Sequence, residues 1–546
     1  GSPTVEDELI GEMTGGDRAL ISSLEGFEDL QLIGRLQLGD RGGERGDTVI
    51  CVTEGGETSS VIGTILEALE QWKSDGVSDP DETRRRLFFV YNNPDDRLLP
   101  FARSRAVLEE PGITKINLAT GPQAITGSTR MQATTIETFV IASAVETAVE
   151  RVLAGALTRK EMARAGFDGP SSITARLAAF PAILDEVKRS VPALARLTEL
   201  EAGTYAAGRF STYFAGRALI TVFIDSTERS PTFRLFPLDT TAEPGRKCWI
   251  QVWTPAADGR EAWLAFLGRP FRGLSPDIYR QPFETGIDDP YLRTAALESL
   301  KKAGGDQQDL YDFSFADRNV RRRGPERGDL GVVVLAGPEA GGKSGAGPAL
   351  RRFAELFRKN GARLAGVASG EVPLPDDLPQ ITGPGAPVVE LRLPAEGDPF
   401  GIRQQIGLKM LLNSHSTAVM ARLGRVVGNT MTNVSPSNLK LFGRATFLIQ
   451  SHVNDVLARP DWVKTRGHRL PLSYGEANAV LFDTIAFLKD KNKKDGAGQT
   501  AEVALSIIRI LESLREGRGL TNAEALTIVE AKGLAAYLRK VTRDAS

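Results

Sequence analysis

Residues 48–72, with the sequence TVICVTEGGETSSVIGTILEALEQW, contain a strand, a turn and a helix in close succession. The β-branched run at 48–53 predicts a buried strand, and Gly55-Gly56 predicts a tight turn. The hydroxyl residues after the turn begin a helix with apolar residues at helical spacing. Because a helix start leaves backbone N–H groups unpaired, this arrangement predicts a cradle for a phosphate. The candidate ligand-binding residues are Thr53, Thr58 and Ser59.

Further strands predict the class of fold. Residues 87–94 (LFFVYNNP) and 114–120 (TKINLAT) have the composition of two more strands that end in polar turns. Residues 330–337 (LGVVVLAG) predict a buried strand of a second sheet, and the tail from Leu470 contains amphipathic helices. Alternating strands and helices are typical of doubly wound parallel sheets, which bind ligands at the carboxyl ends of their strands.

A second loop before a helix lies in residues 121–155. Ser128 and Thr129 are predicted to cap the helix, which suits an anion but is equally the pattern of an ordinary capped helix. The run Thr126–Met131, TGSTRM, resembles the T-G-S-[ST]-R-[ML] motif of the sugar isomerase (SIS) superfamily. The resemblance is to the branch that contains N-acetylmuramic acid 6-phosphate etherases and the glucokinase regulatory protein. It implies a phosphosugar site that includes Ser128 and Thr129.

An acidic segment follows Gly15-Gly16 near the start of the chain. Its sequence, GGDRALISSLEGFEDL, predicts a break and then a helix that carries Glu25 and Glu28. Such acids usually form a solvated face. The segment resembles G-G-x-x-A-L…E-G-x-E-D of the same branch, in which a glutamate reaches the sugar. The resemblance makes Glu25 and Glu28 candidates, of which we favour Glu28 as a ligand-binding residue and, if the protein is a lyase, as a catalytic one.

Residues 406–450 form the second long match to this branch, including N-x-x-S-T-A and the later SNLKLFGRA. We expect one helix to end near Gly428-Asn429 and the next to begin with Lys440 in its first turn. A lysine at a helix start is a good partner for a phosphate, although a surface lysine is the plain alternative. The resemblance makes Lys440 the strongest ligand-binding candidate. His415 is expected to be a packed residue.

The resemblance implies two doubly wound, Rossmann-like SIS domains in tandem with a C-terminal helical cap. We predict a first SIS domain at 1–195, a second at 196–465 and the cap at 466–546. Glu57 and Ser59 depart from the family's loop, so the ligand preference is expected to differ. The sequence has no initiator Met, and the family's first phosphate loop and a second catalytic carboxylate would precede residue 1. We therefore expect that part of the first domain to be missing.

Two other charged patterns carry less weight. Residues 337–344 match the Walker A spacing formally, but the prolines and glycines around Lys343 would interrupt the helix that must begin there. ATP binding is therefore not our main expectation. Arg321–Arg323 predict a solvated connector.

The composition excludes several classes of protein. The 67 Lys and Arg nearly balance the 69 Asp and Glu, so no overall charge favours nucleic acid or a membrane surface. Cys51 and Cys248 lie in apolar runs, which predicts core residues in a reducing cytoplasm rather than a disulfide or a metal site. No apolar stretch has the length of a membrane span, and no signal peptide opens the chain. We expect no metal and no cofactor.

The sequence leads to one main functional hypothesis and two alternatives. The main one is a regulator that resembles the glucokinase regulatory protein and binds a fructose phosphate or amino-sugar phosphate between its lobes, with a sugar kinase as partner. The first alternative is an etherase-like lyase, which needs two carboxylates with separate roles. The second is a sugar-phosphate isomerase. The sequence leaves undecided whether the protein is an enzyme.

Overall fold

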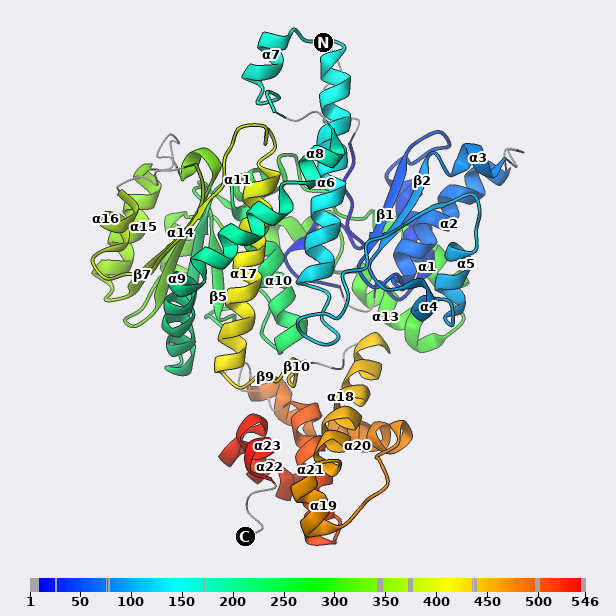
Figure 1. Ribbon diagram of the computed structural model, residues 1–546, viewed down its shortest axis with the longest axis vertical. Coiled ribbons are helices and arrows are strands. Elements are labelled where there is room, and N and C mark those ends of the chain that lie inside the picture. The colour runs from blue at the N-terminus through cyan, green and yellow to red at the C-terminus, as the bar shows by residue number, and fades with distance from the viewer. Residues whose placement is uncertain are drawn as a thin grey trace.

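The computed structural model describes residues 9–541, apart from 25–26, 75, 77–78, 170–171, 341–346, 372–376, 435, 437–438 and 496–500; at 439–440 and 490–495 it describes the backbone alone. Two separate parallel sheets and a C-terminal group of helices make up the described chain (Figure 1). This arrangement confirms the predicted α/β class with parallel sheets. The predicted domain limits stay predictions, and residues 195 and 465 lie inside the helices α9 and α19.

The first sheet has the strand order β1-β2-β3, and all three strands are parallel. Its strands are β1 (Val49–Thr53), β2 (Leu87–Tyr91) and β3 (Thr114–Asn117), close to the predicted runs. The helices of this part are α1 (Gln31–Asp40), α2 (Ser59–Ser74), α3 (Pro80–Thr83), α4 (Asp95–Leu98) and α5 (Ala102–Leu108). β1 differs from a fully buried strand because it is an edge strand, and Ile50 and Val52 are 40 % and 39 % exposed.

The second sheet has the order β5-β4-β6-β7-β8, again with parallel strands. Its strands are β4 (Ser211–Ala215), β5 (Ile250–Trp253), β6 (Leu330–Ala336), β7 (Arg363–Gly370) and β8 (Val388–Arg392). β6 is buried along its whole length, as predicted. Because side chains alternate between the faces of a strand, Val332 and Val334 join one apolar core and Val333 and Leu335 join another.

Helices cover both faces of the second sheet. α9 (Phe180–Ala206) and α10 (Leu219–Phe233) contribute to the core of Val332, and α15 (Gly347–Lys359) and α16 (Asp377–Thr382) contribute to the core of Val333. The chain between β5 and β6 forms α11 (Gly259–Leu267), α12 (Pro276–Gly286), α13 (Pro290–Leu300) and α14 (Asp317–Arg323).

Two long helices lie in contact with each other between the sheets, α6 (Gln132–Ala154) and α17 (Ile402–Arg422) (Figure 1). α6 also contacts β2, whereas α17 contacts β7 and β8. The short helices α7 (Arg159–Arg164) and α8 (Ile173–Leu177) follow α6. The pair α6 and α17 therefore connects the first sheet to the second.

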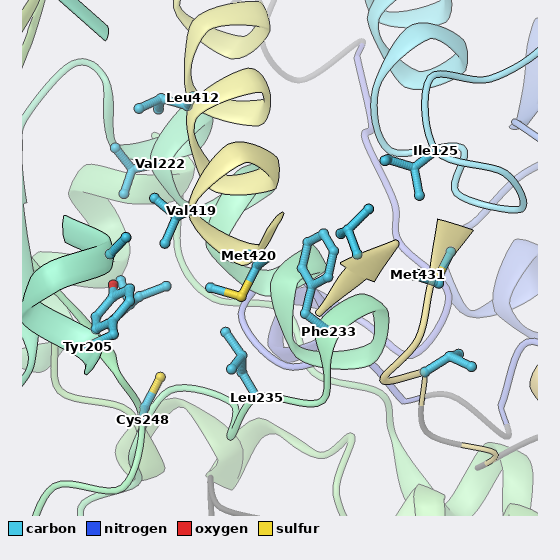
Figure 2. Close-up of a cluster of buried hydrophobic side chains, with 14 of the residues drawn as sticks. Ile125, Tyr205, Val222, Phe233, Leu235, Cys248, Leu412, Val419, Met420 and Met431 are labelled. Atoms are coloured by element: carbon cyan, nitrogen blue, oxygen red, sulfur yellow. The ribbon is translucent and has the colours of Figure 1, made fainter. Parts of the chain in front are cut away.

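The C-terminal helices pack below the two sheets in the view of Figure 1. They are α18 (Leu439–Leu457), α19 (Pro460–Arg466), α20 (Tyr474–Asp495), α21 (Glu502–Glu516), α22 (Asn522–Lys532) and α23 (Leu534–Lys540). One apolar core runs from the second sheet into these helices. Figure 2 shows side chains of α10, α17 and β10 gathered in that core, among them Val222, Met420 and Met431. Within the described residues, no helix has the length and apolar character needed to cross a membrane.

Two predicted helix limits are wrong. The segment after Gly16 forms a short 3₁₀ helix at Asp17–Leu20 followed by turns, and Glu28 lies in a turn rather than in a helix. Phe27, next to Glu28, is buried in an apolar core in which its ring packs against that of Phe283, and this burial favours the turn. The helix α17 ends at Arg422, because the chain turns back into the short hairpin β9 (Val426–Val427) and β10 (Thr430–Met431). The predicted helix end, Gly428-Asn429, is the turn of that hairpin.

Candidate functional site

The turn between β1 and α2 has the predicted form. The hydroxyls of Thr53 and Thr58 are 2.8 Å apart, and Ser59 is the first residue of α2. Gly56 has a φ of +70°, and a Cβ there would lie 2.6 Å from a methyl group of Leu98. Hydroxyl groups are thus gathered at the start of a 16-residue helix, where the N–H groups and the helix dipole favour an anion.

Glu28 lies next to this helix start. Its carbonyl oxygen accepts a hydrogen bond from the backbone N–H of Ser60 at 3.0 Å, and its side chain is half-buried. The hydroxyl of Ser60 in turn contacts that of Thr14 at 2.9 Å. The structure therefore brings Glu28 beside Thr58 and Ser59, whereas Glu25 lies outside the described residues.

The loop before α6 differs in detail from the prediction. The residue that precedes the helix is Met131, whose side chain makes no capping bond, so Ser128 and Thr129 are not the caps. Instead, the carbonyl oxygen of Thr129 accepts hydrogen bonds from the N–H and the hydroxyl of Thr134, at 3.2 and 3.0 Å, and this folds the loop back onto the helix. Ser128 is buried and Thr129 is half-buried.

The two motif-bearing segments meet although the contacting residues are about 300 positions apart in the sequence. The N–H of Thr126 donates to the carbonyl oxygen of Asn429 at 2.7 Å, and Thr126 forms a bridge with Thr430. Gly127 lies against α18, since a Cβ there would be 3.1 Å from Nε of Arg444. Lys440 lies one turn before Arg444 in α18; its side chain is outside the described part of the chain, so its role stays a prediction.

Two carboxyl groups that the sequence analysis did not select lie near these loops. Glu54 follows β1 directly, and its Oε1 accepts a hydrogen bond from the hydroxyl of Thr134 at 3.1 Å. Glu137, one turn further along α6 than Ala133, is 2 % exposed, and its Oε1 has no hydrogen-bond partner among the described residues. The available signal was a glutamate on the buried stripe of α6, four residues after a buried alanine.

The environments of these groups differ electrostatically. Burial, together with the nearby negative charge of Glu54, raises the pKa of Glu137 to about 9, against the opposing charge of Lys409. Glu137 is therefore a neutral carboxylic acid at pH 7. Burial and the charge of Arg130 lower the pKa of Lys409 to about 8. The Lys409 ammonium is fully bonded, to the carbonyl oxygen of Arg130 at 3.0 Å and to the side-chain oxygens of Thr135 and Asn413 at 2.9 Å each.

Asp225 of α10 holds the loop of Arg130 from the side of the second sheet. It accepts hydrogen bonds from Arg130, Arg229, Asn413 and Ser416. Although burial opposes ionisation, the charges of Arg229 and Arg130 lower the pKa of Asp225. Arg130 of the TGSTR motif is thus a buried connector between α6, α10 and α17, and its NH2 group is held by Asp225 and Ser416.

The remaining candidates have structural roles. His415 is fully buried between Glu201 and Thr198, as predicted for a packed histidine. Cys51 and Cys248 are buried free thiols. Arg322 and Arg323 bond to carbonyl oxygens of the loop before β5 rather than lying free. The described residues contain no group of three His, Cys, Asp or Glu that would hold a metal ion. Lys343 of the Walker-like pattern lies outside the described part of the chain.

Comparison with known proteins points in one direction. No family model matches the sequence. The chain is 36 % identical over 147 residues to an N-acetylmuramic acid 6-phosphate etherase of Parasynechococcus marenigrum, a match that covers 26 % of this chain and 42 % of the relative. It is 33 % identical over 180 residues to the etherase of a Synechococcus species, covering 32 % and 48 %, and 27 % identical over 135 residues to etherase 1 of Bacillus licheniformis, covering 25 % and 37 %. The chain therefore spans less than half the length of these relatives, and it is similar over about a quarter to a third of its own length to proteins named as etherases of a sugar phosphate.

Proposed function

We propose that the protein binds an amino-sugar phosphate where the turn between β1 and α2, the loop before α6 and the start of α18 meet. The contact between Thr126 and the hairpin at 429–430 carries this proposal, because it joins segments that resemble the same family from opposite parts of the chain. The phosphate would bind the hydroxyls and N–H groups at Thr58, Ser59, Ser128 and Thr129. Glu28 and Lys440 would contact the sugar and the phosphate.

We infer lyase chemistry at this site, in preference to the regulatory role expected first. Cleavage of a lactyl ether by proton abstraction and acid-assisted departure needs one ionised and one protonated carboxyl group. Glu137 is protonated at neutral pH and suits the acid. Glu28 and Glu54 are the candidates for the base. The names of the relatives reported above support the same choice.

The regulatory alternative would use the same residues, with a fructose phosphate as ligand and a sugar kinase as partner. An isomerase would likewise bind there. No contact of the described residues favours either alternative over the lyase. Neither alternative releases lactate, so a single assay separates both of them from the lyase.

The test is incubation of the protein with N-acetylmuramic acid 6-phosphate and measurement of released lactate by a coupled dehydrogenase. We expect lactate release that falls by about 100-fold in Glu137→Gln, since a lost acid typically costs 10² to 10⁴ in rate. Glu199→Gln is the matched control, because Glu199 is an exposed residue paired with Arg422. Thermal stabilisation by the sugar phosphate without any release of lactate would favour the regulator. If the sugar phosphate neither stabilises the protein nor yields lactate, the proposed site is refuted.

A further inference from the structure

The second sheet has its own place where an anion would be expected. Its order, β5-β4-β6-β7-β8, means that the chain leaves β4 in one direction, to β5, and later returns past β4 to β6. In open α/β sheets, ligands bind at the carboxyl ends of the strands at such a reversal. Three residues separate the end of β4 at Ala215 from the start of α10 at Leu219, so the positive end of the α10 dipole lies at this point.

A carboxylate of the chain itself occupies this place. Glu339 follows β6 in the short 3₁₀ helix Gly337–Glu339 and is 8 % exposed. Its two oxygens accept the backbone N–H of Arg217 at 3.0 and 3.1 Å, and the carboxylate also bonds to the N–H of Ala336. The ends of β4 and β6 are thus connected through one carboxylate.

Gly216 shows how closely the carboxylate approaches the backbone. A Cβ at this position would lie 2.2 Å from Oε1 of Glu339, so any other residue type would require the Glu339 carboxylate to move away. Glycine that lets an anion reach the backbone is the usual construction of phosphate-binding turns. The corresponding turn of the first sheet also contains glycines, but it presents the hydroxyls of Thr53 and Thr58 instead.

We propose that Glu339 is a built-in anion that closes the reversal point of the second sheet, so that no external phosphate binds there while its carboxylate is in place. The second sheet then offers no second ligand site at this point. This inference holds whether or not the first sheet binds a sugar phosphate. Burial raises the pKa of Glu339, and the N–H groups of Arg217 and Ala336 oppose this.

The test compares Glu339→Ala with the wild type in thermal unfolding, with inorganic phosphate as the probe. Removing the carboxylate leaves its place at the Arg217 N–H empty, so the variant should have a lower melting temperature than the wild type. Added phosphate should raise the melting temperature of the variant by about 2 to 4 °C more than that of the wild type. The control is Asp239→Ala. Asp239 is also a buried carboxylate bonded to backbone N–H groups, of Lys247 and Cys248, but it lies before β5 at the other end of the strands. That variant should lose stability without a phosphate-dependent recovery.

Glu339→Ser also removes the carboxylate and vacates its place, and it covers the case in which the alanine variant does not fold. Its Arg217 amide should exchange hydrogen faster than in the wild type, and phosphate should slow the exchange again. The proposal is overturned if the folded variants recover no more than the wild type, or if the wild type itself gains phosphate protection at Arg217. Any phosphate that binds at the first sheet should stabilise the wild type and the variants equally, so its effect cancels when their phosphate-dependent shifts are compared.

Discussion

At the scale of single residues, Glu137 and Asp225 are two buried carboxyl groups whose pKa values are shifted in opposite directions. Asp225 accepts bonds from two arginines and stays ionised, whereas Glu137 has an oxygen without a described partner and stays protonated. Burial without a partner costs free energy, and residues kept in that state are often functional. The two groups therefore predict different responses to the same chemical change.

Glu137→Gln should make the protein more stable and less active. The pKa of Glu137 is raised in the folded state, so its stabilising contribution is complete below the unfolded value near 4.5 and is lost as the pH rises towards 9. Glutamine stays neutral, and at pH 8 we expect its free energy of unfolding to exceed that of the wild type by about 2 to 4 kcal/mol. At pH 4 the two should be equal. Urea denaturation at both pH values checks this, and an equal difference at both would contradict it.

Asp225→Asn should be strongly destabilising. The change leaves Arg130 and Arg229 buried with less compensating charge, which typically costs about 3 to 5 kcal/mol. Asp185→Asn is the matched control, because Asp185 forms an exposed pair with Lys188 that should contribute less than about 1 kcal/mol. Urea denaturation gives both values. A small loss for Asp225→Asn would show that the network does not hold the loop of Arg130.

Part of the site could be predicted residue by residue. Thr53, Thr58 and Ser59 lie in one strand, turn and helix start, so their proximity follows from local sequence. Glu54 and Glu137 could not be found in this way, because their coupling depends on how α6 packs against the end of β1. The partners of Arg130 likewise come from α10 and α17, which the sequence does not place beside the motif.

At the scale of elements, a glycine in the sequence indicated where the chain turns but did not distinguish a helix end from a hairpin turn. Gly428-Asn429 was expected to end a helix and instead forms the turn of the hairpin β9 and β10, since both structures use a residue with positive φ. The limits of the strands in the first sheet were predicted closely, because turn residues on either side of a short apolar run fix where the strand begins and ends. The hairpin matters to the site, because Thr126 pairs with Thr430.

Gly127→Ala tests the junction between the loop before α6 and α18. Gly127 has a φ of +77°, and an added Cβ would press on Arg444. Gly121→Ala is the control, since Gly121 has a φ of +78° with nothing near the added atom. Both variants should lose about 1 kcal/mol from backbone strain, but only Gly127→Ala should weaken sugar-phosphate binding, by about tenfold. Calorimetric titration with N-acetylglucosamine 6-phosphate measures this, and equal affinities would contradict the proposed place of the ligand.

At the scale of the whole molecule, the two sheets differ in what they pack against. The first sheet has a core of its own between α2 and its strands, whereas one apolar core joins the second sheet, α17 and the C-terminal helices. The parallel α/β class could be predicted because strands and helices alternate along the chain. The route by which residues 126 and 430 meet could not, because it depends on the packing of α6 against α17.

The most direct measurement is calorimetric titration of the whole protein with N-acetylglucosamine 6-phosphate and, separately, with N-acetylglucosamine. The account predicts one site per chain for the phosphorylated sugar, no measurable heat for the unphosphorylated one, and loss of binding in the double variant Thr58→Ala and Ser128→Ala. Two equivalent sites per chain, or binding that survives the double variant in a folded protein, would contradict it.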